Sequence, residues 1–159
     1  MEKTVISDAN APNPIGSYNQ AVVANGFVFT AGQIAIDPSN GELIDGSFKD
    51  RVDQVFKNLS AILDRAGTDL SKVVKFTVFL TDMAQYNEVN DVFNNWLNEE
   101  DAPARSLVAV KGLPAGTDVE IECIALVRFV YVSLFHFYCD NIWNCFGSDY
   151  RLNIDFRSL

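Results

Sequence analysis

The chain has 159 residues, of which 48% are hydrophobic and 21% are charged, a composition typical of one globular domain with a sizeable core. Its formal net charge of −9 repels a nucleic-acid backbone, and no run of Lys and Arg offers a basic patch, so we do not expect a nucleic-acid partner. The N-terminus lacks a hydrophobic signal segment and an Arg-rich transit segment, which favours a cytoplasmic protein without a membrane partner. The three cysteines are irregularly spaced and predict a reducing compartment.

The N-terminal part predicts strands joined by tight turns. Residues 4–7 indicate an edge strand, and a loop with two prolines follows it. Residues 21–24 and 27–31 flank Asn25-Gly26, the dipeptide that most strongly favours a two-residue hairpin turn. Another turn is predicted at residues 37–41, with room for one more short strand around Ile34.

Two amphipathic helices alternate with a strand in the middle of the chain. Ser47 and Asp50 form a variant of the capping box, the apolar residues that follow recur at helical spacing, and Gly67 ends the helix. Residues 73–80 predict a strand, after which Asp82 caps a second helix. The predicted inward face of the second helix consists of Tyr86, Val89, Phe93, Trp96 and Leu97.

A carboxylate on an otherwise apolar strand is the most informative local feature. Residues 119–127 predict a central strand, because both of its faces turn apolar toward its end, and Glu120 lies on the face opposite Ile121. A hairpin across residues 113–117 would pair this strand with the one that begins at Arg105. The sheet would then bring a permanent cation near a partly buried base, which suits a small carboxylate substrate that needs an activated water.

The order of these elements predicts an α+β fold. We expect a two-layer domain over residues 1–128, with a mixed sheet and both helices on one face. The second sheet face is also apolar at the last strand, and a two-layer domain has nothing left to cover it. We therefore infer a subunit interface on that face.

Residues 129–159 differ in composition from the rest of the chain. They hold 9 of the 19 aromatic residues without a helical or strand period, so we expect them to lie outside the fold and interpret them as sequence of a mistaken gene model. The tail also contains His136, Cys139 and Cys145, whose spacing fits no zinc motif and lacks a fourth ligand. We expect no metal site.

Several short motifs resemble one known family over residues 1–128. They are Gly16-Ser17-Tyr18-Asn19-Gln20-Ala21, Phe29-Thr30-Ala31-Gly32-Gln33-Ile34, Val89-Asn90, Pro103-Ala104-Arg105-Ser106, Leu113-Pro114 and Val119-Glu120-Ile121-Glu122. Together these segments resemble the RidA/YjgF family of imine and enamine deaminases. The resemblance implies a chorismate-mutase-like homotrimer with three clefts between subunits. It also implies hydrolysis of 2-aminoacrylate and related 2-imino acids to 2-oxo acids and ammonia, without a metal or organic cofactor.

The resemblance also implies roles for five residues. Arg105 would bind the substrate carboxylate, and Glu120 would position the attacking water. Tyr18 would line the cleft beside Glu120 as the second member of the catalytic set. Gly32 would offer a backbone contact, and Asn90 would contact the substrate or order the wall.

One position departs from the family. Many active relatives carry a cysteine where this chain has Leu107, so any role of that thiol is absent here.

Other interpretations of the same residues remain open at this point. Arg105 can be an ordinary surface ion-pair residue, Glu120 its structural salt-bridge partner, and Tyr18 a core residue with a satisfied hydroxyl. At the level of function, the alternatives are an endoribonuclease acting as a translation inhibitor and a non-catalytic trimer that binds small ligands.

Overall fold

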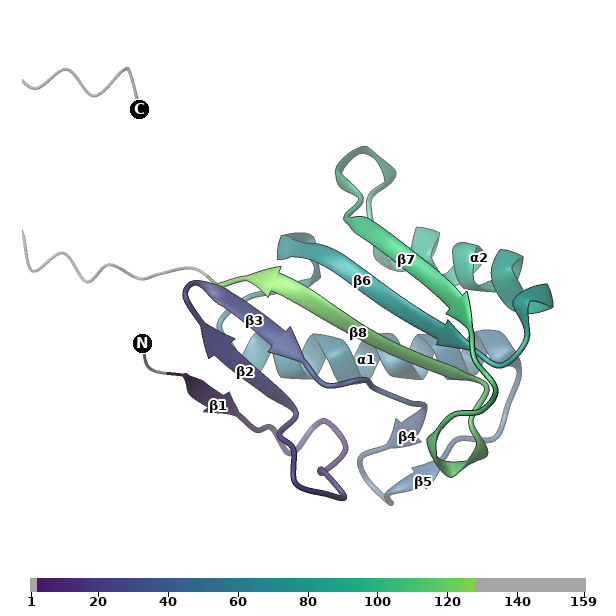
Figure 1. The fold of residues 1–159 in the computed structure, drawn as a ribbon, viewed down its shortest axis with the longest axis horizontal. Coiled ribbons are helices and arrows are strands. Elements are labelled where there is room, and N and C mark those ends of the chain that lie inside the picture. Colours follow the sequence, from purple (N-terminus) through teal and green to yellow (C-terminus); the bar gives the residue numbers. More distant parts are fainter. Residues whose placement is uncertain (1–2, 128–159) are drawn as a thin grey trace, which may run out of the picture. The chain divides into compact units, whose positions relative to one another are not determined.

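The computed structural model of the protein describes residues 3–127. Six strands form one mixed sheet in the order β1-β2-β3-β8-β6-β7, and two helices pack on one of its faces (Figure 1). This arrangement confirms the predicted α+β fold with both helices on one face. The elements are β1 (Thr4–Ile6), β2 (Ala21–Ala24), β3 (Phe27–Thr30), β4 (Ile36–Asp37), β5 (Glu42–Leu43), α1 (Phe48–Arg65), β6 (Val73–Leu80), α2 (Tyr86–Trp96), β7 (Ala104–Ala109) and β8 (Val119–Leu126).

The elements with strong local signals form where the sequence predicts them. Asn25 and Gly26 adopt φ values of 50° and 82°, as the turn between β2 and β3 requires. At the start of α1, the Ser47 side chain accepts a hydrogen bond from the backbone N–H of Asp50, and the Asp50 side chain accepts one from the backbone N–H of Ser47. Gly67 follows the helix with φ of 79°, which confirms it as the stop signal. The short strands β4 and β5 pair with each other on either side of the turn predicted at residues 37–41.

Helix α2 differs from the prediction at its start. Asp82 caps a 3-10 turn, through a hydrogen bond from Ala84 N–H, and α2 itself begins only at Tyr86. Because Tyr86 is the first residue of the helix, it lies at the rim of the core and is 43% exposed, so it is not one of the buried residues of the inward face. Val92 is buried in its place, together with Val89 and Phe93.

The predicted hairpin between the last two strands is wrong. β7 pairs in parallel with β6, and β8 pairs antiparallel with β6 on its other side. The cause is α2, because a strand that follows a helix packed on the sheet returns parallel to the strand before that helix. The nine residues between β7 and β8 then carry the chain past β6.

β8 is central, as predicted, and the structure decides which of its faces meets the helices. Ile121 and Cys123 are buried on the helix side, whereas Glu120, Glu122 and Ile124 are partly exposed on the other. Neither helix covers that second face (Figure 1). Its exposed apolar side chains are Val5, Phe27, Phe29, Val108 and Leu126.

Two further predictions concern membranes and the tail. Among residues 3–127, no helix is long and apolar enough to cross a membrane. The tail of residues 129–159, with His136, Cys139 and Cys145, lies outside the described residues, so its separation from the fold stays a prediction.

Candidate functional site

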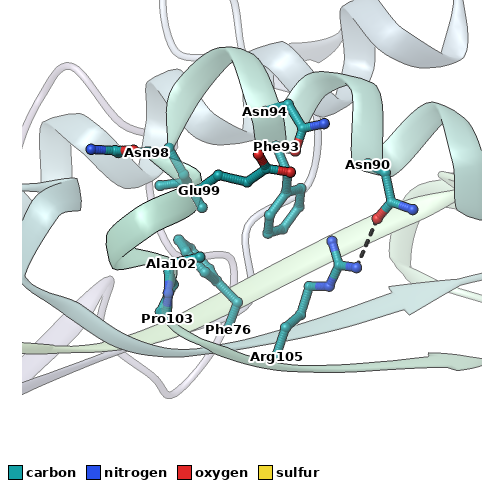
Figure 2. Close-up of a pocket in the computed structure, with 10 residues that line it drawn as sticks. Phe76, Asn90, Phe93, Asn94, Asn98, Glu99, Ala102, Pro103 and Arg105 are labelled. Carbon is teal, nitrogen blue, oxygen red and sulfur yellow. Dashed lines mark hydrogen bonds between the residues drawn. The ribbon is translucent and has the colours of Figure 1, made fainter.

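Arg105 extends from β7 toward helix α2. It pairs in the sheet with Phe76, whose ring is buried under the helices, so the two side chains share the helix-facing side. One Nη2–H of Arg105 donates a hydrogen bond of 2.7 Å to the Asn90 side-chain oxygen, and the guanidinium carbon lies 4.8 Å from the centre of the Phe93 ring (Figure 2). The two residues predicted to bind substrate, Arg105 and Asn90, are therefore in direct contact.

A cavity of about 250 Å³ opens beside this contact. Arg105 rises into it from the sheet, and Glu99 lies on the α2 side (Figure 2). Its lining is Phe76, Asn90, Phe93, Asn94, Leu97, Asn98, Glu99, Ala102, Pro103 and Arg105. Neither charged group is neutralised there, because no ion pair between residues 3–127 includes Arg105 or Glu99. A small anion would therefore meet a guanidinium without an ion-pair partner in the described part of the chain, beside the rings of Phe76 and Phe93, with the carboxylate of Glu99 on the same lining.

Glu120 lies on the opposite face of the sheet. It pairs with Phe79 of β6, and its side chain is partly buried. Burial, followed by the negative charge of Glu122, raises the pKa of the Glu120 carboxyl above its ordinary value. Within residues 3–127 no cation forms an ion pair with it. A carboxyl with a raised pKa suits the exchange of a proton with a bound water near neutral pH.

Gly32 packs directly against the Glu120 side chain. A Cβ at position 32 would lie 2.7 Å from Cδ and 2.9 Å from Cγ of Glu120, and nearer still to its Oε1. The backbones of Gln33 and Ile121 exchange hydrogen bonds of 2.8 and 3.0 Å, and these hold the two segments together. Any larger residue here would therefore displace the Glu120 carboxylate from its present position.

Tyr18 lies on the loop before β2, and a backbone hydrogen bond connects the end of this loop to the segment that contains Gly32. Its ring is 51% exposed, and its hydroxyl accepts a hydrogen bond of 3.2 Å from the backbone N–H of Ile15. Two residues later, the carbonyl of Gln20 accepts a hydrogen bond from the backbone N–H of Ala31. The exposure of Tyr18 contradicts the alternative that it is a core residue.

The start of β8 is fixed by an ion pair to helix α1. Arg51 donates hydrogen bonds of 2.9 and 2.5 Å to the two carboxylate oxygens of Asp118. Burial raises the pKa of Asp118, but the hydrogen bonds and charge of Arg51 outweigh burial and hold the pKa below its ordinary value. Because Asp118 precedes Glu120 by two residues, this pair anchors the strand that carries the candidate base.

The predicted site residues form two groups on opposite faces of one sheet. Arg105 and Asn90 lie on the helix side, whereas Glu120 and Gly32 lie on the other side. Within one chain, the expected proximity of Arg105 to Glu120 is wrong, and so is the alternative of a salt bridge between them. Across β7, β6 and β8, Arg105 is in register with Cys123, an odd number of residues from Glu120. Side chains at an odd separation along a strand point to opposite faces.

Neither Leu107 nor Cys123 provides a reactive thiol in this chain. Leu107 lies on the same strand and face as Arg105, in register with Val78, and packs against the core. Cys123 is the free cysteine among the described residues, and burial raises the pKa of its thiol to about 12. No group of His, Cys, Asp and Glu within residues 3–127 could hold a metal ion.

A family model described as Endoribonuclease L-PSP matches residues 8–127. The chain belongs to this family. It is the RidA/YjgF family that the sequence motifs indicated. The RutC family protein of Synechocystis sp. is 46% identical over 128 residues, which cover 80% of this chain and 98% of the relative. The human 2-iminobutanoate/2-iminopropanoate deaminase is 40% identical over 124 residues, which cover 78% of this chain and 90% of the relative.

Solved structures of RidA relatives have the same fold. RidA from the Antarctic bacterium Psychrobacter sp. superposes with a TM-score of 0.75 at 43% identity, covering 78% of this chain and 99% of that one. The E. coli TdcF structure with bound serine superposes with a TM-score of 0.73 at 36% identity, covering 79% and 99%.

Two residues beside Arg105 were not among the predicted site residues. Phe93 was assigned to the core, and Tyr86 to the inward face of α2. Their spacing from Asn90 is a signal in the sequence, since positions 86, 90 and 93 lie on one stripe of a helix.

Proposed function

We propose that this RidA-family protein is an imine/enamine deaminase of the hydrolase class, acting on 2-imino acids of the 2-aminoacrylate type. Water adds to the C=N carbon, and the resulting carbinolamine loses ammonia to give the 2-oxo acid. The observation that carries the proposal is Arg105, a partly buried guanidinium without an acidic partner among residues 3–127. Such a group binds a carboxylate through two parallel hydrogen bonds and cannot lose its proton. The deaminase name of the human relative supports the same reaction.

In this proposal Glu120 acts on the water. Its raised pKa allows it to accept a proton from the attacking water and return it to the leaving nitrogen. Gly32 fixes the position of its carboxylate and offers a backbone contact, while Tyr18 contributes to the wall of the cleft. The reaction needs no metal or organic cofactor.

We further propose that the site is shared between subunits of a homotrimer. One chain presents Arg105 and Glu120 on opposite faces of its sheet, so a single copy cannot bring both to one substrate. A second copy supplies the missing half if the Arg105 cavity of one subunit meets the Glu120 face of the next. The exposed apolar side chains on that face, among them Phe29 and Leu126, favour burial against a neighbour.

Ammonia release from freshly generated 2-aminoacrylate tests the function. The wild-type protein should accelerate release above the spontaneous background, and Arg105→Ala should return the rate to that background. Lys111→Ala is the matched control, because Lys111 is an exposed cation outside the cavity and should leave the rate unchanged. A wild-type rate equal to background would contradict the deaminase and favour a trimer that binds small ligands without turnover. Serine in the E. coli TdcF structure gives that second function its support.

An endoribonuclease is the remaining candidate, because the matching family model carries that description. The net charge of −9 opposes it. Incubation with single-stranded RNA decides the matter, and cleavage that disappears in Arg105→Ala would establish the nuclease. A cytoplasmic location completes the proposal, and cell fractionation would test it.

A further inference from the structure

The guanidinium of Arg105 is held by uncharged groups. Its carbon lies 4.8 Å from the Phe93 ring centre and 5.8 Å from the Tyr86 ring centre, and its one hydrogen bond within residues 3–127 goes to the Asn90 amide. The face of an aromatic ring attracts a cation through its quadrupole without cancelling its charge. A carboxylate in the same place would neutralise the guanidinium and compete with an anionic ligand.

The ring of Phe93 is itself fixed by its neighbours. It meets Phe56 edge-on, with centroids 4.8 Å apart at 83°, and Phe76 at 5.3 Å and 76°. Phe93 is 6% exposed, so one side of the ring belongs to the core while Arg105 lies over it. A long and otherwise flexible side chain thus rests on a rigid platform, and less rotamer entropy is lost when a ligand binds.

Tyr86 and Asn90 complete the arrangement from the same stripe of α2. Asn90 accepts from only one of the five N–H donors of the guanidinium, so the remaining donors stay available for a forked contact with a carboxylate. Tyr86 lies at the exposed rim, where its ring borders the guanidinium on a second side.

We propose that Phe93 and Tyr86 are positioning residues that form an aromatic cradle for Arg105. The cradle consists of these two rings. It orients the guanidinium fork and preserves its full charge for the substrate carboxylate. This inference rests on the proposed function, but the orientation of Arg105 can be measured without turnover.

Nuclear magnetic resonance measures the cradle directly in the full-length protein. The Arg105 Nε–Hε signal, assigned by its loss in Arg105→Lys, should be displaced by the ring current of Phe93. Phe93→Leu should return it toward the position of a solvated arginine. Val28→Ala is the matched control, because Val28 is fully buried in the same core but lies on β3, three strands away from β7 in the sheet. An Arg105 signal that Phe93→Leu leaves in place would overturn the proposal.

Ligand binding supplies the second measurement, with 2-oxobutanoate as the probe. Phe93→Leu should raise the Kd for 2-oxobutanoate and the KM for the imine, each by roughly tenfold. The kcat should change by less than about threefold. Phe93→Tyr restores a ring face and should recover the affinity. Tyr86→Phe should match wild type, whereas Tyr86→Leu should weaken binding a few-fold. Because Tyr86 is exposed, this second pair of variants decides the question even if Phe93→Leu does not fold.

The two proposals fail in different ways. Equal losses of affinity in Phe93→Leu and Val28→Ala would show a merely structural role and overturn the cradle. A wild-type protein without imine hydrolysis would overturn the deaminase, while the Arg105 signal would still decide the cradle.

Discussion

Replacing Gly32 with alanine should disable the site by displacing one carboxylate. The new methyl group would lie 2.7 Å from Cδ and 2.9 Å from Cγ of Glu120. Carbon atoms in favourable contact are about 3.5–4.0 Å apart, so the carbons of the Glu120 side chain must retreat by roughly 1 Å, and Oε1, which lies nearer, must move further. The backbone of Gly32 is not in the left-handed region, so alanine itself is compatible with the conformation.

The expected loss of activity follows from that displacement. A catalytic group misplaced by about 1 Å costs on the order of 10²-fold in rate, so turnover of 2-aminoacrylate should fall by about that factor in Gly32→Ala. Binding of 2-oxobutanoate should weaken less, because Arg105 and its cavity are formed on the opposite face of the sheet. Overpacking should also lower the free energy of unfolding by up to about 3 kcal/mol.

Ammonia release, calorimetry and urea unfolding measure the three effects. Gly112→Ala is the matched control, since a Cβ at position 112 would lie in open space, and it should change none of them. Introducing Gly32→Ala into the Glu120→Ala variant tests whether contact with the Glu120 side chain causes the destabilisation. With the Glu120 side chain removed, the destabilisation should largely vanish, giving a large interaction energy in the double-mutant cycle. Equal destabilisation in both backgrounds, or near wild-type turnover in Gly32→Ala, would refute the reasoning.

Five other changes test the remaining assignments. Glu120→Gln should lower turnover by about 10²-fold, measured as ammonia release, while 2-oxobutanoate still binds. Burial and the charge of Glu122 raise the pKa of Glu120, so the contribution of this carboxyl to stability is complete below its ordinary pKa of 4.5 and is lost as pH rises through the folded pKa. Glu120→Gln should therefore raise the free energy of unfolding in urea at pH 7 but not at pH 4. Arg105→Lys loses the planar fork and should weaken 2-oxobutanoate binding in calorimetry by roughly tenfold, and an unchanged Kd would contradict its role. Ile121→Asp should unfold the subunit, because Ile121 is fully buried on the helix side, whereas Ile124→Asp on the other face should leave it folded but dissociate the assembly, as circular dichroism and gel filtration would show. Deleting residues 130–159 should keep the fold and the proposed trimer, and a truncated protein without a cooperative thermal transition would contradict the placement of the tail outside the fold.

Elements whose signals are local could be predicted from the sequence. The turn at Asn25-Gly26 and the capping box at Ser47 depend on residues within three positions of one another, and both formed as expected. The central position of β8 could also be inferred, because apolar residues dominate this single segment, although its second face is only partly buried in one chain. The strand pattern singled out Glu120 and Arg105, whereas the candidates Tyr18, Gly32 and Asn90 came from the family motifs.

The pairing of β7 could not be predicted in the same way. A segment of nine residues between two strands is compatible with a hairpin and with a passage across a third strand. The choice depends on where α2 packs, which is a contact between residues far apart in the chain. The close approach of Gly32 to Glu120 has the same origin, since the two are brought together by the pairing of Gln33 with Ile121.

The division of the site between two faces follows from that one pairing. In a hairpin, a register chosen freely can place Arg105 and Glu120 on the same face, and the site then closes within one chain. With β6 between them, Arg105 aligns with Phe76 and then with Cys123, which fixes an odd separation from Glu120. No rotamer change can move either side chain through the sheet. If both residues act on one substrate, the second must come from another copy of the chain. The packing of α2, which determines the pairing of β7, would then also determine that the proposed activity needs an assembly of subunits.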